Sequence, residues 1–499
     1  MDNQIFGSTT IILCVIGYFF SWKYYSKSNY KIAVLLLMIC GLLLRVYTSF
    51  DFFLNTWDER YHALVAKNLL KHPLIPTLYD NPLLPYNYND WTSNHIWLHK
   101  PPLPLYMISL SFWLFGVSEI ALRLPSILMT TLGIQLTYSI GKYFFNNKVG
   151  FLSAFFYSIN GLIIEMTAGR VATDHVDVFF LFFIELAVFF SICFIQNKKI
   201  IFNIVTGISI GCAILSKWLP ALIVLPIWLL IILDSKKFTT KEILAHALIL
   251  ISTIVCIFLP WQLYIFNTFP REANWEASFN LRHITETLDG RSGSIFYYLN
   301  KIRVNYGELI YLPLIYYIWK TVKKLSNLKS IAIGVWILIP LFFFSFVKTK
   351  MQGFILFTSP ALFLITADFW YLLYEKKEIK KTKWIVVILM LLFIALPVRY
   401  SIERMKPFEA RDRNPQWVSE LRTAKQKLDK NSVLFNYPRP IEAMFYTNAI
   451  VYEGIPDDST LHKIKDKGFN VVINQNGDLP KWLSKNEFSF IDLTCPKSN

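Results

Sequence analysis

Long apolar runs separated by short polar loops occupy most of the first 400 residues. A helix needs about 20 apolar residues to cross the hydrocarbon core of a bilayer, with roughly 17–25 as the working range. Twelve runs approach that length, and the first is interpreted as a span because no small-residue cleavage pattern follows it. The pattern predicts a polytopic α-helical membrane protein. The runs are 5–22, 31–50, 120–140, 149–165, 175–195, 200–216, 218–233, 244–266, 296–319, 331–347, 354–374 and 384–399.

A thirteenth apolar run, 103–117, is shorter and follows Pro101-Pro102. Lysine positions indicate whether it crosses, because Lys and Arg accumulate in short cytoplasmic loops. If this segment lies in the outer leaflet without crossing, six basic loops fall on one side. We therefore predict a multi-pass protein of the cell (inner) membrane, with its N-terminus and tail outside the cytoplasm. The basic loops contain Lys23, Lys27, Lys31, Lys142, Lys148, Lys198, Lys199, Lys236, Lys237, Lys241, Lys320, Lys323, Lys324, Lys329, Lys376, Lys377, Lys380, Lys381 and Lys383.

The chain changes character after residue 400, where charged residues alternate with short apolar stretches. Asn414-Pro415 predicts a helix start, with Asn as the cap and Pro at the first helical position, followed by a helix over 416–428. Three stretches read as short strands, so we expect a small extracytoplasmic α/β domain. The strands are 433–437, 449–453 and 469–474. The predicted division is an extra N-terminal span (1–30), a membrane domain with a catalytic outer loop at 51–119 (31–400), and a soluble domain (401–499).

Composition excludes several classes of protein. Of the 499 residues 54% are hydrophobic and 17% charged, against about 25% charged residues in ordinary globular domains. The net charge of +16 comes mostly from the lysine loops, so no nucleic-acid partner is required. The six cysteines lie far apart, five of them within apolar runs, which indicates neither a disulfide framework nor a metal cluster. The chain has no Walker A loop, dinucleotide fingerprint or HExxH motif.

Two adjacent acids, Asp58 and Glu59, follow the second span. One interpretation is structural, because Thr56 and Glu59 have the spacing of a capping box and acids stabilise the first turn of a helix. The other is catalytic: one of the two acids is a general base at the membrane surface, where a low dielectric constant tunes a carboxyl pKa toward neutrality. The sequence leaves both interpretations open.

Basic side chains gather in the same outer loops. Lys100 ends the first long loop, and Arg170 stands four residues before Asp174, a spacing that also fits an ordinary helical ion pair. Isolated lysines at span ends are usually interfacial anchors, which is the structural alternative for each. Together they suit a lipid-linked phosphate, since Lys supplies a point charge and Arg a bidentate fork. The other outer-face cations are Lys217, Arg282, His283, Arg291, Lys348 and Lys350.

An ordered set of short motifs covers roughly residues 31–400. It comprises Asp58-Glu59, Lys100-Pro101-Pro102-Leu103, Leu114-Phe115-Gly116, Ser118-Glu119, Arg123-Leu124-Pro125, Arg170 with Asp174, and Thr349-Lys350 before Phe354 and Pro360. No motif is specific alone, but their order and spacing resemble polyprenyl-phosphate-sugar-dependent membrane glycosyltransferases of the C-type fold. The similarity is greatest to the branch of protein O-mannosyltransferases and lipid A aminoarabinose transferases.

The resemblance implies transfer of a sugar from a polyprenyl-phosphate donor to a lipid, glycan or protein acceptor on the extracytoplasmic face. It implies Asp58 as the catalytic base and Asp174 as a second acid, with Glu59 beside the base. The aminoarabinose branch has an acid where this chain has His99, so the cofactor question stays open between none and a divalent metal held by His99 and His283. The implied substrate-binding residues are Lys100, Arg170, His62, Tyr61, Lys217, Arg282, His283, Arg291 and Lys350.

An integral membrane transporter of lipids or solutes is the rival hypothesis. Transporters place functional ionisable residues near the bilayer midplane, often on repeated halves of the chain. Here the charges cluster at one surface, no second half repeats the first, and the spans hold few charges, namely Arg45, Glu165 and Glu185. A scaffold that binds a partner through its tail is a third reading, which only the tail favours.

Overall fold

The computed structural model describes residues 2–171, 176–323, 325, 327–376, 383–484 and 486–494. It divides into two compact units. The first, here called the membrane unit, contains Met1–Ser49, Lys100–Pro104 and Arg123–Ala410. The second, here called the loop–tail unit, contains Phe50–His99, Leu105–Leu122 and Arg411–Asn499. The first outer loop thus groups with the C-terminal residues.

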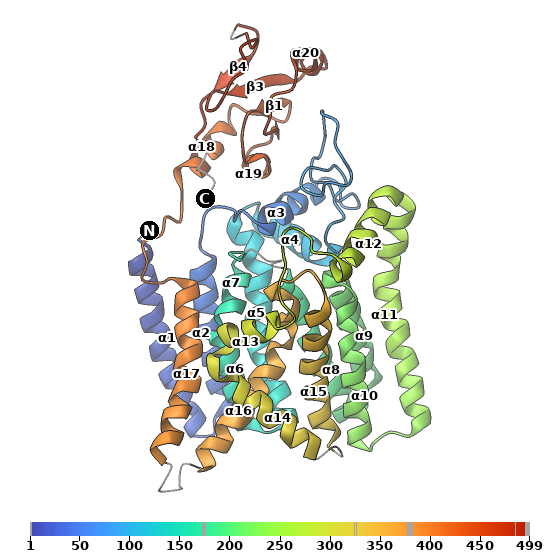
Figure 1. The fold of residues 1–499 in the computed structure, drawn as a ribbon, viewed down its shortest axis with the longest axis vertical. Helices are drawn as coiled ribbons and strands as arrows, with labels where there is room; N and C mark the ends of the chain where they lie inside the picture. Colours follow the sequence, from blue (N-terminus) through green and yellow to red (C-terminus); the bar gives the residue numbers. More distant parts are fainter. Residues whose placement is uncertain are drawn as a thin grey trace. The chain divides into compact units, whose positions relative to one another are not determined.

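Helices account for nearly all of the membrane unit (Figure 1). Within the described residues, nine are long and apolar enough to cross a membrane, or ten if one bent pair counts as a span. The nine match nine of the twelve predicted spans, and the chain is a multi-span membrane protein. They are α1 (Asn3–Ser26), α2 (Tyr30–Ser49), α5 (Glu119–Phe144), α8 (Asp177–Asn197), α9 (Ile200–Lys217), α11 (Thr240–Thr268), α15 (Leu328–Phe346), η3 with α16 (Gln352–Lys376) and α17 (Lys383–Met405).

The other three predicted spans are not continuous helices. Run 149–165 bends by 51° at Asn160, whose side chain caps the second helix by accepting from Ile163 N. Run 218–233 begins at Trp218, which has φ +72°, and continues as a 3-10 helix over Leu219–Ile223, so its α-helical part has only 12 residues. Run 296–319 breaks at Gly307, whose φ of +98° few other residues adopt. The resulting pieces are α6 (Asn147–Ile159), α7 (Gly161–Thr167), η1 (Leu219–Ile223), α10 (Val224–Ser235), α13 (Tyr297–Tyr306), η2 (Glu308–Ile310) and α14 (Tyr311–Lys323).

Two further helices belong to the outer loops of the sequence prediction. The run 103–117 forms α4 (Pro102–Phe115), which has 14 residues. At 1.5 Å per residue it is about 21 Å long, shorter than the roughly 30 Å hydrocarbon core. Its length therefore agrees with the prediction that it does not cross. The loop between α11 and α13 contains α12 (Pro270–Thr285).

The helix ends that flank the predicted basic loops all lie at one end of the membrane unit (Figure 1). These are the adjoining ends of α1 and α2, α5 and α6, α8 and α9, α10 and α11, α14 and α15, and α16 and α17. This end is called the lysine-rich end below. The prediction that 103–117 does not cross the membrane requires such a common end for the basic loops. Which side of the membrane this end faces stays a prediction.

A small parallel sheet forms the core of the C-terminal part of the loop–tail unit. Its strand order is β2-β1-β3-β4, and all three pairings are parallel. Central β1 is buried along its whole length, as expected of a parallel strand covered on both faces. The predicted helix and three strands are confirmed, but the predicted cap is wrong: Pro415, not Asn414, occupies the N-cap position, and the helix begins at Gln416. Strand β4 was not predicted. The elements are α18 (Gln416–Ala424), β1 (Ser432–Phe435), α19 (Pro440–Tyr446), β2 (Ile450–Val451), α20 (Asp458–Asp466), β3 (Asn470–Asn474) and β4 (Ser489–Ile491).

Candidate active site

The two adjacent acids begin α3 (Asp58–Leu69), and the structure gives them different surroundings. Glu59 is buried, and its Oε2 accepts hydrogen bonds from both the main-chain and the side-chain nitrogen of Asn55, each at 2.7 Å. Asp58 is half-buried and forms no hydrogen bond or ion pair with any residue that the structure describes. Glu59 therefore stabilises the turn before α3, while the carboxylate of Asp58 has no hydrogen-bonding partner among the described residues.

The capping box predicted between Thr56 and Glu59 does not form. The residue before α3 is Trp57, which makes no side-chain capping bond, and Glu59 reaches back to Asn55 rather than to Thr56. The reason is geometric: the helix begins one residue later than the capping-box spacing assumes, so Thr56 is not its cap.

Aromatic and imidazole rings pack beside α3 in the loop–tail unit. The ring of His99 stacks on Trp91 with a centroid separation of 4.2 Å, and Tyr61 meets the same indole at 5.0 Å. His62 is buried with its ring edge-on to Trp97 at 5.8 Å. Burial raises the pKa of Tyr61. The predicted residues Tyr61, His62 and His99 thus belong to one ring cluster near the start of α3.

The C-terminal residues hold the loop that carries Asp58. The buried carboxylate of Asp51 pairs with Arg411 at 2.8 Å and with Arg413 at 3.1 Å. The Lys67 ammonium, on α3, donates to three carbonyl oxygens at the end of α19, each at 2.8 Å. A cation suits a helix C-terminus because the last carbonyls have no partner within the helix. No sequence pattern indicates these contacts, because their partners lie more than 350 positions apart.

Glu119 forms two further contacts with the C-terminal tail. Glu119 is buried, and its Oε1 accepts from the Tyr446 hydroxyl at 2.7 Å and from Arg422 at 2.6 Å. The same tyrosine oxygen accepts from the main-chain nitrogen of Leu54 at 3.0 Å, four residues before Asp58. The entry to α3 is therefore held by hydrogen bonds whose donors and acceptors come from the tail.

In the membrane unit, a main-chain pairing brings three predicted residues together at the end opposite the lysine-rich end. Lys350 N donates to Arg291 O at 2.8 Å, and Thr349 N donates to His283 O at 3.1 Å. The Thr349 hydroxyl also joins the two segments, donating to Glu286 O at 2.8 Å. Arg282 lies one residue earlier and forms an exposed pair with Glu286 at 2.8 Å. His283, Arg291 and Lys350 thus share one layer.

Lys350 is buried and caps the end of α15. Its ammonium donates to the carbonyls of Phe344 at 2.8 Å and Ser345 at 2.6 Å, which uses two of its three protons. Burial, together with the charge of nearby Lys348, lowers the pKa of Lys350. The geometry gives this lysine a structural task besides any contact with a ligand.

Lys217 is connected through two aromatic rings to the layer that contains His283, Arg291 and Lys350. Its ammonium pairs with Asp177 at the start of α8 and lies 4.8 Å from the centre of the Phe354 ring. The Phe354 ring is 5.4 Å from that of Phe344, whose carbonyl accepts from Lys350. Asp177 was missed by the sequence reading, although a carboxylate in the first turn of a span facing a lysine at the next span's end was a usable signal.

The remaining predicted residues of the membrane unit lie near α7 and α4. Arg170 follows Gly169, which ends α7 with φ +66°, and donates to Met405 O at 3.4 Å. Its predicted partner Asp174 lies outside the described residues. Lys100 is half-buried, two residues before α4.

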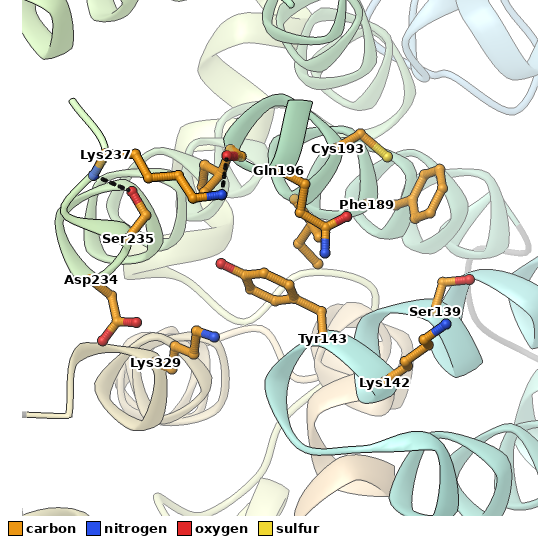
Figure 2. Close-up of a pocket in the computed structure, with 12 residues that line it drawn as sticks. Ser139, Lys142, Tyr143, Phe189, Cys193, Gln196, Asp234, Ser235, Lys237 and Lys329 are labelled. Carbon is orange, nitrogen blue, oxygen red and sulfur yellow. Dashed lines mark hydrogen bonds between the residues drawn. The ribbon is translucent and has the colours of Figure 1, made fainter. Parts of the chain in front are cut away.

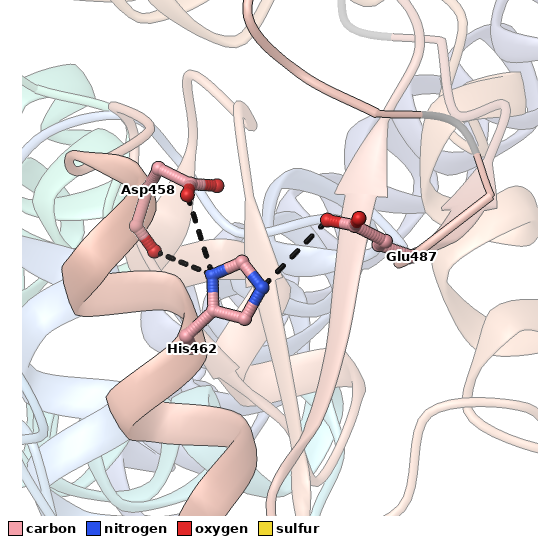
Figure 3. A group of neighbouring side chains, drawn as sticks. All are labelled: Asp458, His462 and Glu487. Carbon is pink, nitrogen blue, oxygen red and sulfur yellow. Dashed lines mark hydrogen bonds and ion pairs between the residues drawn. The ribbon is translucent and has the colours of Figure 1, made fainter.

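The metal hypothesis has no support from His99 or His283 in the described part of the chain. The His283 Nδ1 faces the carbonyl of Phe279, one turn earlier, at 2.9 Å. One group of ligand-type side chains is close enough to share an ion among the described residues, namely Asp458, His462 and Glu487 (Figure 3). There Asp458 faces one ring nitrogen of His462 at 3.5 Å and Glu487 faces the other at 3.6 Å. Carboxylates on opposite sides of one imidazole suit an ion-paired histidine better than a shared metal.

Comparisons with known proteins agree with this architecture. The family described as dolichyl-phosphate-mannose-protein mannosyltransferase matches residues 99–261. An undecaprenyl phosphate-alpha-4-amino-4-deoxy-L-arabinose arabinosyl transferase of Pseudomonas savastanoi is 24% identical over 297 residues, which are 56% of this chain and 53% of that protein. The chain thus spans about half the length of that relative.

Solved structures of membrane glycosyltransferases share the fold. ArnT from Cupriavidus metallidurans, bound to undecaprenyl phosphate, superposes with a TM-score of 0.59 at 16% identity, covering 87% of this chain and 88% of that one. This chain has the C-type glycosyltransferase fold. The archaeal oligosaccharyltransferase AglB from Archaeoglobus fulgidus matches with a TM-score of 0.54 at 11% identity, covering 87% of this chain and 68% of that one. The predicted fold class is confirmed.

Proposed function

We propose that this protein transfers a sugar from a polyprenyl phosphate to an acceptor hydroxyl, with Asp58 as the base. The fold supports the reaction class, since the structural neighbours are membrane glycosyltransferases. One of them was solved with undecaprenyl phosphate, and the sequence relative is named for a sugar linked to the same lipid phosphate. A lipid-linked donor also suits a chain of many spans. The reaction is proposed to occur on the face opposite the lysine-rich end.

The observation that carries the choice of base is the contrast between Asp58 and Glu59. A general base must be able to reach the proton that it removes, so a carboxylate saturated by structural hydrogen bonds is a poor candidate. Glu59 Oε2 already accepts two hydrogen bonds from Asn55 in a buried position. Asp58 has neither restraint among the described residues and sits at the start of a helix.

The proposed chemistry is a single displacement with inversion at the anomeric carbon. The acceptor oxygen forms a bond to that carbon, the bond from the carbon to the phosphate oxygen breaks, and the electron pair leaves with the polyprenyl phosphate. The acceptor's proton goes to Asp58. General base catalysis of this kind contributes about 10²–10⁴-fold to the rate.

Cations of the membrane unit are proposed to bind the donor phosphate. Lys217 and the layer formed by His283, Arg291 and Lys350 lie at the same end of the helices and share an aromatic wall. A phosphate that gains charge as it leaves is stabilised by cations already in place, and removing one such partner commonly costs about 3–4 kcal/mol. The proposal also includes Arg170 and Lys100 as substrate-binding residues and Asp174 as a second acid.

The charges inside the spans argue against transport. Arg45 donates to Thr130 Oγ1 at 2.9 Å and to the Gly41 carbonyl at 2.9 Å, and Glu185 accepts from Thr137 at 2.6 Å. Both side chains are fully buried between helices. Charges held in this way by neighbouring helices stabilise the bundle, whereas transport requires them to face a pathway for the substrate.

The test compares Asp58→Asn with Glu59→Gln in the purified full chain, with a polyprenyl-phosphate sugar as donor. Asp58→Asn should reduce kcat by about 10²–10⁴-fold while donor binding and thermal stability stay near those of the wild type. Glu59→Gln should instead lower stability, because it weakens the hold on Asn55. Normal turnover by Asp58→Asn would remove the proposed base. Mass analysis of lipid-linked sugars in cells lacking the protein would identify the donor, which should accumulate.

A further inference from the structure

A cavity of about 660 Å³ lies at the lysine-rich end of the membrane unit, the end opposite the layer of His283, Arg291 and Lys350. Figure 2 shows the residues that line it. The ends of α5, α8 and α10 and the start of α15 surround it. Three lysines line it, namely Lys142 near the end of α5, Lys237 just after α10 and Lys329 at the start of α15, against one carboxylate, Asp234. The cavity therefore carries a local excess of positive charge.

These lysines have few partners within the described part of the chain. Lys329 lies over the ring of Tyr143 at 4.3 Å, and Lys237 makes a long hydrogen bond of 3.4 Å to the carbonyl of Ile195. None of the three forms an ion pair within 4.0 Å with a described carboxylate. Three ammonium groups that share a cavity with a single carboxylate repel one another, so a bound anion would relieve the repulsion.

The rest of the lining supplies neutral hydrogen-bonding groups on one side and an apolar wall on the other. Figure 2 shows the Tyr143 hydroxyl and the Gln196 amide extending into the space between the helices. Phe189, Ile192 and Cys193 of α8 form the apolar part. Lysines with a hydroxyl and an amide suit phosphate oxygens, and the apolar residues suit the start of an acyl chain.

We propose that this cavity binds a phosphate group, supplied by the headgroup of an anionic phospholipid in the leaflet at the lysine-rich end. A soluble phosphate would satisfy the same lysines, but it would leave the apolar wall of α8 without a partner. Basic pockets between membrane helices on the lysine-rich side bind anionic headgroups in other proteins. The site is distinct from the proposed donor site and does not depend on the proposed function.

A competing explanation for these lysines is the general excess of lysine in the cytoplasmic loops of membrane proteins, which requires no binding cavity. The two explanations differ in which lysines matter. Lys27, Lys31 and Lys241 are exposed at the same end but do not line the cavity. Replacing those three changes the net charge by as much as replacing the lining lysines, so the two triple variants form a matched pair.

The experiment uses the purified full chain in detergent, titrated with phosphatidylglycerol or phosphatidylcholine and followed by native mass spectrometry. Lys329→Gln should weaken phosphatidylglycerol binding by about fivefold, the loss expected for one cation near an anionic headgroup. The triple variant of Lys142, Lys237 and Lys329 should lose more, and the matched control triple should stay within about twofold of the wild type. Phosphatidylcholine should bind weakly to all of them.

Three results would overturn the proposal. Equal loss in the two triple variants would show a diffuse charge effect, and equal binding of the two lipids would show that the phosphate's charge is not recognised. Displacement of phosphatidylglycerol by millimolar inorganic phosphate would assign the site to a soluble anion. Should the triple variant fail to fold, Lys142→Gln provides the same comparison, since that exposed side chain makes no hydrogen bond with a described residue.

Discussion

Asp51→Asn should destabilise the loop–tail unit more than any other exchange of a carboxylate for an amide in the loop. Asp51 is 1% exposed and bridges Arg411 at 2.8 Å and Arg413 at 3.1 Å. The side chain of Arg413 is only 4% exposed, so water cannot replace the lost carboxylate. Asparagine keeps one acceptor oxygen but no charge, which leaves the Arg413 guanidinium buried without its counter-ion.

The expected loss follows from that burial. Breaking a buried ion pair by removing one partner costs about 3–5 kcal/mol, because the other charge is left uncompensated. For a unit of 150 residues or more, each kcal/mol shifts Tm by roughly 2–4 °C, so a loss near 4 kcal/mol corresponds to about 8–16 °C. Turnover should fall as well, since Asp51 ties the tail to the segment that enters α3.

The assay is protease resistance of the full chain during a temperature ramp, scored by cleavage within the tail. Asp80→Asn is the matched control, because Asp80 lies in the same loop and pairs with Lys71 at 2.9 Å, but the lysine side chain is 59% exposed. Surface pairs of this kind contribute about 0–1 kcal/mol. Asp80 also faces His72 at 3.1 Å, so each aspartate contacts two basic side chains, and the exposure of those side chains is the difference that the comparison tests. Equal shifts for the two variants would refute the reasoning.

Burial lowers the pKa of Lys67 to about 7, against 10.5 in the unfolded chain, so the unfolded state binds more protons between these values. The free energy of unfolding of the wild type should therefore rise from pH 7 toward pH 10, relative to that of Lys67→Met. Thermal melts at several pH values measure this difference. Parallel plots of unfolding free energy against pH for the two proteins would contradict the prediction. Tyr446→Phe removes the hydroxyl shared by Glu119 and Leu54 and should cost about 1–3 kcal/mol in the same melts. Lys217→Gln should raise the donor KM by about tenfold if its ammonium contacts the phosphate, and an unchanged KM in initial-rate measurements would assign the lysine to its pair with Asp177 alone.

The helical spans were predictable because a bilayer imposes a minimum length of apolar chain, and that length is visible without any knowledge of packing. The three exceptions follow local details that a hydropathy count ignores. Gly307 takes φ +98°, Trp218 takes φ +72°, and Asn160 caps a new helix within an apolar run. Each changes the helical path of the backbone, but the mean hydropathy of its segment stays high enough for the segment to be predicted as a span.

The candidate site was predictable in its residue types and their order along the chain. Asp58, Tyr61 and His62 stand on α3, and the main-chain pairing joins His283 and Arg291 to Lys350 through segments about 60 residues apart. The sequence could not choose between Asp58 and Glu59, because that choice depends on the hydrogen bonds of Asn55. It also gave no indication that Lys350 caps α15, since the accepting carbonyls become available only where that helix ends.

By itself, the sequence determined that the chain crosses a membrane many times, that its lysines gather at one end of the spans and that a small α/β part follows them. These properties depend on local composition and periodicity, which each segment carries alone. Only the tertiary structure decided that the tail holds the loop of Asp58 through Asp51 and Lys67, and that three lysines far apart in the sequence line one cavity. Contacts between residues hundreds of positions apart depend on how the whole chain packs, and no local pattern records them.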